Sequence, residues 1–297
     1  MNIYVPLTPF QFLQSIAISK DDEEKSILIV LRTCISMYKE LNIDDECSNI
    51  TFLLFSEDNI SLNVTSRTNY FAISSFAMRL KKRFGSDHHI LTGSDDNFFV
   101  KIIYKALGSD LSLLEDGTGS FSPEPLSIRK KLAIFIDKYV FGTNLGEGGL
   151  GSSVASSYYF VNRNAFKYIS QVEKKIEILD SFTSSCRTLG SQVNMTTDTL
   201  LVLPPWDLCA SGDFKFQMFS DFDVAVKFHP RETKAGIESW KRLFDKDCSN
   251  KVTYVEKYQL PLELFISQDY VSRVISLESS TTCSTAKLFK KEFIPLC

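Results

Sequence analysis

Short apolar runs alternate with longer segments of helical periodicity in the first half of the chain. The runs typical of buried strands are 3–5, 51–55 and 110–114, and the segments with helical spacing are 10–18, 26–41, 71–84 and 98–107. Strands that alternate with helices are typical of a parallel sheet wrapped by helices. The first half is therefore expected to form an α/β domain.

The same alternation restarts near residue 200, after a polar stretch at 181–199 that predicts a linker. Its apolar runs are 200–203, 224–228, 252–255 and 274–277, and its helical segments are 237–244, 261–267 and 286–293. A chain of 297 residues is long enough for two domains of moderate size. We expect two Rossmann-like domains facing a central cleft, an N-terminal one over 1–185 and a C-terminal one over 198–297.

Three polar motifs directly follow apolar runs. They are Glu115-Asp116-Gly117 after 110–114, His229-Pro230 after 224–228, and Ser279-Ser280 after 274–277. A carboxylate can accept a proton, and hydroxyls beside unpaired backbone N–H groups can bind an anion. Because ligands of open α/β sheets bind outside the carboxyl ends of the strands, the motifs predict one site for an anion and a proton transfer.

The first motif leaves two candidates for the proton acceptor. Consecutive side chains on an extended segment point to opposite faces, so only one of Glu115 and Asp116 is expected in the cleft, unless the turn at Gly117 brings in the second. Asp116 is preferred because it adjoins Gly117. The alternative is a solvated turn, since Asp-Gly is a common turn pair.

The second and third motifs each have a phosphate-binding and a structural interpretation. Proline is favoured at the first helical position, so Pro230 predicts a helix toward Phe244 with His229 at its positive end, which suits a phosphate. The alternative is a histidine that only caps the helix. Serines at a strand-to-helix turn can likewise be ordinary N-caps.

Two other short patterns suggest different ligands. Asp221-Phe222-Asp223 is a D-x-D pattern, which in metal-dependent GT-A glycosyltransferases holds a divalent ion on a nucleotide diphosphate. It precedes the 224–228 run, so it is expected at the opposite end of that strand from His229. Gly146, Gly148 and Gly151 spell G-x-G-x-x-G, but a dinucleotide site needs a strand before it and a helix after it. The following segment 158–161 predicts a strand, so we expect a loop there.

Composition narrows the partners and the compartment. The net charge of −3 excludes a molecule that binds nucleic acid through overall charge, and the seven scattered cysteines predict reduced thiols without zinc spacing. No signal peptide or apolar span is evident, so we expect a cytoplasmic protein. The basic clusters at 79–83 and 129–131 fit solvated helix faces or a patch facing anionic lipids. The second interpretation would give the protein a peripheral contact with the inner membrane.

The ordered motifs resemble those of bacterial sialyltransferases, of the lipooligosaccharide and polysialyl type. Further elements of the resemblance are the T-P-x-Q opening at 8–11, Lys227-Phe228 before His229-Pro230, and P-x-E at 261–263. The resemblance implies a GT-B-like glycosyltransferase fold and an enzyme that transfers sialic acid from CMP-sialic acid to a bacterial surface glycan such as lipopolysaccharide, lipooligosaccharide or capsule.

The resemblance also implies roles for individual residues. Asp116 or Glu115 would be the general base, and His229 would assist the departing CMP phosphate. Ser279 and Ser280 would bind that phosphate, and Glu263 would bind the ribose. The substrate site would be completed by Pro230, Gly117, Thr8 and Gln11. No cofactor or metal is expected, because CMP carries a single phosphate, and direct attack would invert the sugar.

Two alternatives of other classes stay open at this point. One is a metal-dependent GT-A-type enzyme that uses UDP-sugars through Asp221 and Asp223. The other is a glycan- or nucleotide-binding protein of the same fold without turnover. The acceptor, the linkage and the oligomeric state leave no signal in the sequence.

Overall fold

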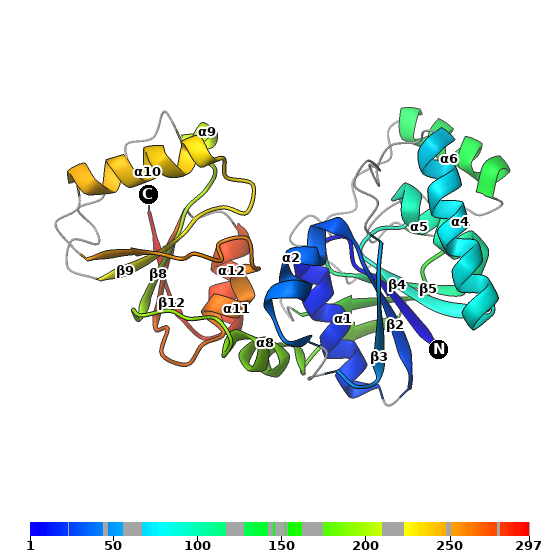
Figure 1. Cartoon of the computed structure of the whole chain (residues 1–297), viewed down its shortest axis with the longest axis horizontal. Coiled ribbons are helices and arrows are strands. Elements are labelled where there is room, and N and C mark those ends of the chain that lie inside the picture. The colour runs from blue at the N-terminus through cyan, green and yellow to red at the C-terminus, as the bar shows by residue number, and fades with distance from the viewer. Residues whose placement is uncertain are drawn as a thin grey trace. The chain divides into compact units, whose positions relative to one another are not determined.

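The computed structural model divides into two compact units, Met1–Phe182 and Thr183–Cys297, which we call unit 1 and unit 2 (Figure 1). The structure describes residues 1–22, 24–43, 47–55, 67–116, 128–141, 145, 152, 154–161, 175–209, 223–247, 251–277 and 280–296. Each unit is described by itself. The boundary falls inside the polar stretch that the sequence predicted as a linker.

Unit 1 is built on a seven-stranded parallel sheet with the order β3-β2-β1-β4-β5-β6-β7. The strands are β1 (Asn2–Val5), β2 (Ser26–Val30), β3 (Ile50–Leu54), β4 (His88–Thr92), β5 (Gly108–Leu114), β6 (Ser157–Phe160) and β7 (Lys175–Ile178). The order reverses between β1 and β4. In doubly wound sheets ligands bind beyond the carboxyl ends of the strands at such a reversal.

Helices cover both faces of this sheet. They are α1 (Pro9–Asp21), α2 (Arg32–Glu40), α4 (Arg67–Phe84), α5 (Phe98–Leu107) and α6 (Ile128–Phe141). Figure 1 shows α1 and α2 on one face and α4, α5 and α6 on the other. The strand order runs from β1 to β3 in one direction and from β1 to β7 in the other. Because the crossovers between parallel strands are right-handed, the helices of the two directions lie on opposite faces. One hydrophobic core lies under α4 and α5, around Phe55, Phe76 and Phe99.

One predicted element of unit 1 is wrong. The segment 26–41 was expected to be a single helix, but β2 occupies its start and α2 begins at Arg32. Every side chain from Ile27 to Val30 is at most 1% exposed. An inner parallel strand is covered on both faces, so its apolar residues are continuous rather than alternating, and such a run resembles a buried helix.

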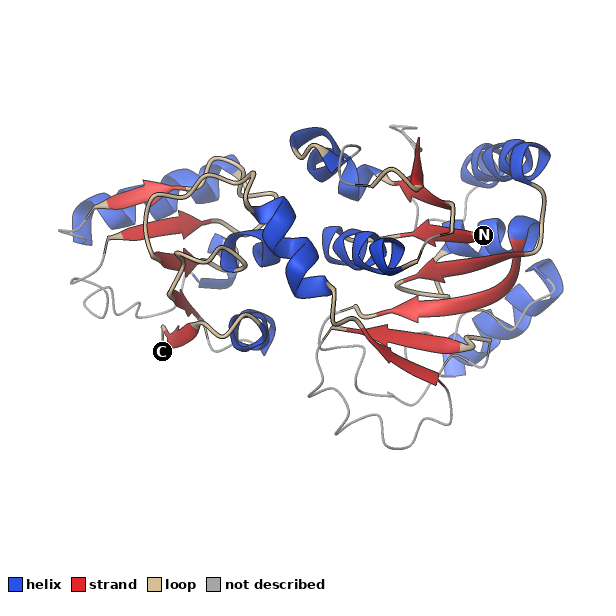
Figure 2. Ribbon diagram, turned by 90° about the horizontal axis from the view of Figure 1, so that it is seen from below, coloured by secondary structure: helices blue, strands red, loops and turns tan. Residues whose placement is uncertain are grey.

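Unit 2 has a five-stranded parallel sheet with the order β10-β9-β8-β11-β12. The strands are β8 (Thr199–Val202), β9 (Val224–Lys227), β10 (Val252–Tyr254), β11 (Arg273–Ser276) and β12 (Glu292–Pro295), and the helices are α8 (Phe182–Gly190), α9 (Trp206–Cys209), α10 (Lys234–Asp247), α11 (Leu262–Ile266) and α12 (Ser280–Leu288). Figure 2 shows strands side by side with helices on both faces of the sheet. Trp240 and Phe244 of α10 fill the core on one face.

Two further predictions in unit 2 need correction. The expected linker contains α8, which packs closely on α11, since the Ser267 hydroxyl donates to the Cys186 carbonyl at 3.0 Å. A Cβ on Gly190 would lie 2.5 Å from the Leu264 carbonyl oxygen, so glycine permits this approach. The helix expected at 286–293 ends at Leu288, and the chain then forms β12, because it pairs with β11 along the sheet edge.

Candidate active site

The T-P-x-Q opening forms the first turn of α1, at the carboxyl edge of the sheet of unit 1. Thr8 is the N-cap, and its hydroxyl accepts the Gln11 N–H at 3.3 Å. Pro9 takes the first helical position, where no N–H is needed. Gln11 and Gln14 follow one turn apart, and both side chains are fully buried. The motif therefore has a structural meaning: it starts the helix and directs glutamine side chains at this edge.

Gln11 holds the carboxylate of Asp116. Its Nε2 donates to Asp116 Oδ1 at 2.7 Å, while its Oε1 accepts the Leu7 N–H at 2.8 Å. The second bond fixes the amide orientation, because an oxygen bound to a donor leaves the NH₂ group for the carboxylate. Asp116 is an exposed residue, yet partial desolvation raises the pKa of its carboxyl above its usual range. An accessible, oriented carboxylate with a raised pKa is suited to accept a proton.

Glu115 is 5% exposed, and its carboxylate has a different partner from that of Asp116. Its Oε2 accepts the Val161 N–H at 2.8 Å, which ties the end of β5 to the end of β6. Gln14 brackets the Glu115 backbone, donating to its carbonyl at 2.8 Å and accepting its N–H at 3.1 Å. Glu115 thus fixes the chain, and Asp116 is the carboxylate of the pair that solvent reaches.

Gly93, the residue after β4, leaves the space that the Gln11 amide occupies. A Cβ at this position would lie 1.8 Å from Gln11 Nε2. We expect Gly93→Ala to displace the amide from Asp116. If Asp116 accepts a proton in a reaction, kcat of that reaction should fall on the order of tenfold, since a hydrogen bond to a charged group contributes about 1.5–3 kcal/mol. The fold should survive, because the atom displaced is the end of a side chain.

A double-mutant cycle tests this route. If Gly93→Ala acts through the amide, kcat should fall in the wild-type background and change little in a Gln11→Ala background. An equal loss of kcat in both backgrounds would show that Gly93→Ala does not act through the Gln11 amide. Thermal unfolding of all four proteins separates this effect from misfolding.

In unit 2, β9 delivers His229 to the carboxyl edge of the sheet. The ring is half-buried, and its Nδ1 accepts the Arg231 N–H at 3.1 Å. The neutral ring therefore carries its proton on Nε2. Desolvation, together with the charges of Arg231 and Lys227, lowers the pKa of His229. Near neutral pH the ring is thus an uncharged hydrogen-bond donor at Nε2.

The predicted helix from Pro230 is wrong. The chain makes a turn after His229, closed by the Glu232 N–H on the His229 carbonyl at 2.9 Å, and α10 begins only at Lys234. Thr233 is the cap, because its hydroxyl accepts the Gly236 N–H at 3.0 Å. His229 therefore lies outside α10, and the argument from a positive helix end does not apply to it.

Glu232 explains why the helix starts late. Its Oε2 accepts the Trp206 N–H at 2.7 Å and its Oε1 accepts the Thr233 N–H at 2.9 Å. These bonds tie the loop after β8 to the loop after β9. Sequence reasoning missed this residue, because its main partner is 26 positions away.

Lys227, whose charge acts on His229, and Glu263, whose charge acts on Lys227, are both buried. Lys227 is 2% exposed, and its Nζ donates to the Tyr258 carbonyl at 2.7 Å and lies 5.3 Å from the Phe265 ring centroid. Burial lowers the pKa of Lys227 to about 8, and the charge of Glu263 opposes that change. Burial also raises the pKa of Glu263, which Lys227 opposes. The sequence placed Lys227 in the His229-Pro230 motif but predicted no role for it. In the structure its charge acts on His229 and lowers the pKa of that ring.

Several predicted residues fall outside the described chain. Gly117, Ser279, Asp221 and the glycines 146, 148 and 151 are among them, and Ser280 is described only by its backbone, as the first residue of α12. Asp223 is exposed and directly precedes β9, at the amino end of that strand. In the described parts of the chain, no three histidine, cysteine or carboxylate side chains cluster as metal ligands would. That the reaction needs no metal stays a prediction.

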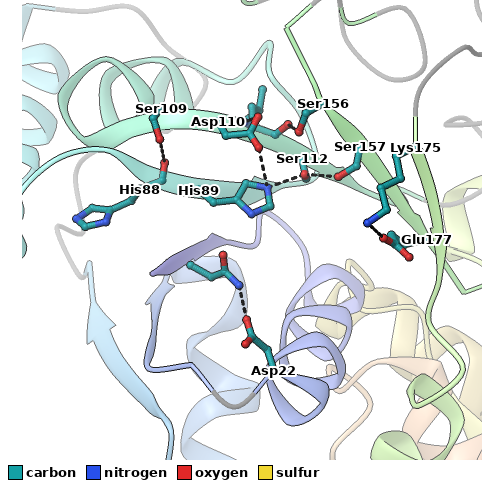
Figure 3. Close-up of polar contacts among 12 residues, drawn as sticks. Asp22, His88, His89, Ser109, Asp110, Ser112, Ser156, Ser157, Lys175 and Glu177 are labelled. Carbon is teal, nitrogen blue, oxygen red and sulfur yellow. Dashed lines mark hydrogen bonds and ion pairs between the residues drawn. The ribbon is translucent and has the colours of Figure 1, made fainter.

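A polar cluster on the sheet of unit 1 has the residue types of a catalytic triad (Figure 3). His89 Nε2 lies 2.6 Å from the Ser112 hydroxyl, which lies 2.6 Å from the Ser157 hydroxyl. Asp110 Oδ2 is 3.9 Å from that same ring nitrogen. A triad needs the acid on the other nitrogen, and Ser112 is fully buried, so a substrate cannot reach it. The cluster joins β4, β5 and β6, and we assign it no catalysis.

A cavity of about 400 Å³ lies at the amino edge of unit 2, where α8 and α11 end. Arg187, Met195, Gln268 and Tyr270 are among its lining residues. None of the residues predicted for the substrate site lines it. The site that the motifs indicate is at the opposite edge of this sheet.

Part of unit 2 matches a protein-family model. The family is described as alpha-2,8-polysialyltransferase (POLYST), and the match covers residues 217–295, less than half of the chain. That segment contains His229, Glu263 and Ser280. A search of curated protein sequences gives no match.

Solved structures resemble the whole chain. They include UGT73P12 of Glycyrrhiza uralensis, complexed with glycyrrhetinic acid 3-O-monoglucuronide, with 9% identity, a TM-score of 0.59 and coverage of 99% of this chain and 76% of that one. The UDP-GlcNAc 2-epimerase of Methanocaldococcus jannaschii has 13% identity and a TM-score of 0.53, with coverage of 100% and 84%. UGT89C1 of Arabidopsis thaliana, complexed with quercetin, has 9% identity and a TM-score of 0.51, with coverage of 99% and 78%.

The chain has a GT-B fold. The predicted fold class is confirmed, with two Rossmann-like units built on parallel sheets. The GT-A architecture that the D-x-D pattern suggested is wrong. At these low identities the likeness extends to the fold alone, and a GT-B fold is shared by transferases and an epimerase.

Proposed function

We propose that the protein is a sialyltransferase, which moves sialic acid from CMP-sialic acid to a hydroxyl group of a bacterial surface glycan. The observation that carries this proposal is the polysialyltransferase match over 217–295, the segment that holds His229, Lys227 and Glu263. The GT-B fold supports a nucleotide-sugar substrate. The donor, the glycan acceptor and the cytoplasmic location belong to the proposal.

Unit 2 would bind the donor through its phosphate. Lys227 and Arg231 provide positive charge beside His229, since both charges lower the pKa of that ring. The Nε2–H of His229 would donate to a phosphate oxygen as the bond to the sugar breaks. This interaction strengthens as negative charge accumulates on CMP, so it would favour the transition state over the bound donor.

Unit 1 would supply the base. Asp116 would take the proton from the acceptor hydroxyl while that oxygen attacks the sugar, and Gln11 would orient the carboxylate. The sialic acid would leave as an oxocarbenium-like species, and a single direct displacement would invert its anomeric centre. Serines 279 and 280 remain proposed phosphate ligands, and Glu263 a proposed ribose ligand.

Nucleotide-dependent stability tests the donor assignment. CMP at about 100 times its Kd should raise the free energy of unfolding by about 2.7 kcal/mol. UDP should have no such effect, and EDTA should change neither result, because one phosphate needs no metal bridge. A thermal shift with UDP and manganese but not with CMP would contradict the proposal. A CMP shift without sugar transfer would indicate a binding protein.

A pair of lysine variants provides the control for this measurement. Lys227→Met should lose most of the CMP effect, whereas Lys246→Met, at an exposed position on α10, should keep it. Lys227→Met leaves the buried Glu263 without its neighbouring cation, so the free energy of unfolding of this variant should fall even without nucleotide. The CMP effect of each variant is therefore measured against the same variant without CMP. Equal CMP shifts in both variants would exclude Lys227 from the phosphate site.

A further inference from the structure

Helix α6 of unit 1 turns an apolar face outward. Its members, which we call the α6 stripe, are Ile128, Leu132, Phe135, Ile136 and Tyr139, and they are between 52% and 87% exposed. They are spaced i, i+4, i+7, i+8 and i+11, which places them on one face of the helix. Helices of globular proteins normally bury such a face. Phe135 and Tyr139 also pack edge-on at 5.0 Å, so the apolar surface is continuous there.

Positive charge accompanies this apolar surface. Lys131 and Lys138 of α6 are exposed and lie seven residues apart, so they follow the same side of the helix. Helix α4, which packs with α6 against α5, exposes Phe71 and Met78 as well. It contains no acidic residue, and its last turns carry a basic cluster. The cluster is Arg79, Lys81, Lys82 and Arg83.

We infer that the α6 stripe and its flanking lysines dock on the surface of an anionic lipid bilayer. An amphipathic helix with exposed large apolar side chains and lysines beside them lies in the plane of such an interface, with its apolar face among the acyl chains. Among the helices that the structure describes, none has the length and hydropathy to cross a bilayer, so this contact is peripheral.

The charges favour a bilayer over a second copy of the chain. A symmetric contact through the stripe would bring the lysines of two copies together, and like charges across an interface are unfavourable. The net charge of the chain is −3, so the excess of positive charge on these two helices is local. Anionic headgroups attract such a local cluster even when the whole protein repels them.

Vesicle co-sedimentation of the full chain tests the inference. Wild-type protein should sediment with phosphatidylcholine vesicles that contain phosphatidylglycerol, and much less with pure phosphatidylcholine vesicles. High salt should weaken the binding, because it screens the lysine charges. Absence of binding to the anionic vesicles at low salt would overturn the inference.

Two double variants identify the surface. Phe135→Ser with Ile136→Ser should weaken vesicle binding at least about tenfold, since two large apolar side chains are lost. Lys131→Glu with Lys138→Glu should weaken it at least about twenty-five-fold, at about a factor of five for each lysine removed from the bilayer surface. All four residues are exposed, so thermal unfolding should not change.

A matched control replaces exposed apolar residues of unit 2. Leu208→Ser with Tyr270→Ser should bind vesicles as the wild type does. Equal binding by the α6 variants and this control would place the lipid contact elsewhere and overturn the inference. Light scattering provides a second outcome that would overturn the inference. If the wild type does not bind vesicles but forms a dimer, and Phe135→Ser with Ile136→Ser abolishes that dimer, the stripe is a subunit interface.

Discussion

Asp116→Asn is expected to lower kcat by about 10²–10⁴-fold, the usual contribution of a general base, while the protein folds normally. Asp116 is exposed at the end of β5, so its carboxylate is not part of the core. The asparagine oxygen can still accept the hydrogen bond from Gln11, and the geometry is therefore kept while the basic group is lost. Sialic acid transfer to a glycan acceptor, measured together with thermal unfolding, checks this expectation.

Glu115→Gln is the matched control for that variant. Glu115 is buried and its Oε2 accepts the Val161 N–H, so a change there should affect the free energy of unfolding more than kcat. Loss of transfer in Glu115→Gln with full activity in Asp116→Asn would reverse the assignment. If both variants keep full activity, neither residue is the base.

The pH profile carries a second signature of Asp116. A base acts when it is deprotonated, so the rate should fall as pH is lowered through its pKa. Desolvation raises the pKa of this carboxyl, and the acidic limb should therefore lie above the value of about 4 for an ordinary aspartate. Gln11→Leu removes a donor to the charged form and should move the limb to still higher pH. If Gln11→Leu and Asp116→Asn both leave the acidic limb at its wild-type pH, Asp116 is not the base.

His229→Ala should lower kcat by about 10²–10³-fold and raise the KM for CMP-sialic acid much less. This is the usual effect of removing one donor that acts on developing negative charge. The Arg231 N–H occupies Nδ1, so the donor is Nε2, and its interaction with the phosphate is strongest in the transition state. Steady-state kinetics with varied donor concentration separates kcat from KM.

Arg231→Ala is the matched control, because only its backbone N–H binds His229. That variant keeps the tautomer, removes one neighbouring charge and should change kcat less than His229→Ala does. With a donor that has a better leaving group, His229→Ala should lose less kcat relative to wild type, since that leaving group needs less stabilisation. An unchanged kcat in His229→Ala would show that the ring only stabilises the turn after β9, through its bond with the Arg231 N–H. Loss of wild-type activity in EDTA would contradict the metal-independent mechanism.

The polar edge of unit 1 shows where sequence reasoning stopped. The T-P-x-Q and Glu-Asp-Gly motifs were both noticed, but their contact was not. Gln11 and Asp116 are 105 positions apart, and they meet because β1 and β5 both run parallel to β4. Gly93 was not singled out, since a glycine after a strand has no local signal for the side chain that fills its space.

Local pattern determined the α/β class, most strands and the strand ends that carry the motifs, because an apolar run and its turn residues act within a few positions. It failed at β2, whose burial on both faces depends on neighbouring strands, and after His229, where the bonds of Glu232 delay the start of α10. Only the tertiary structure decided that Asp116 is accessible and Glu115 is buried, and that Lys227 accompanies His229. Burial and pKa depend on residues distant in sequence, which parallel strand pairing brings together.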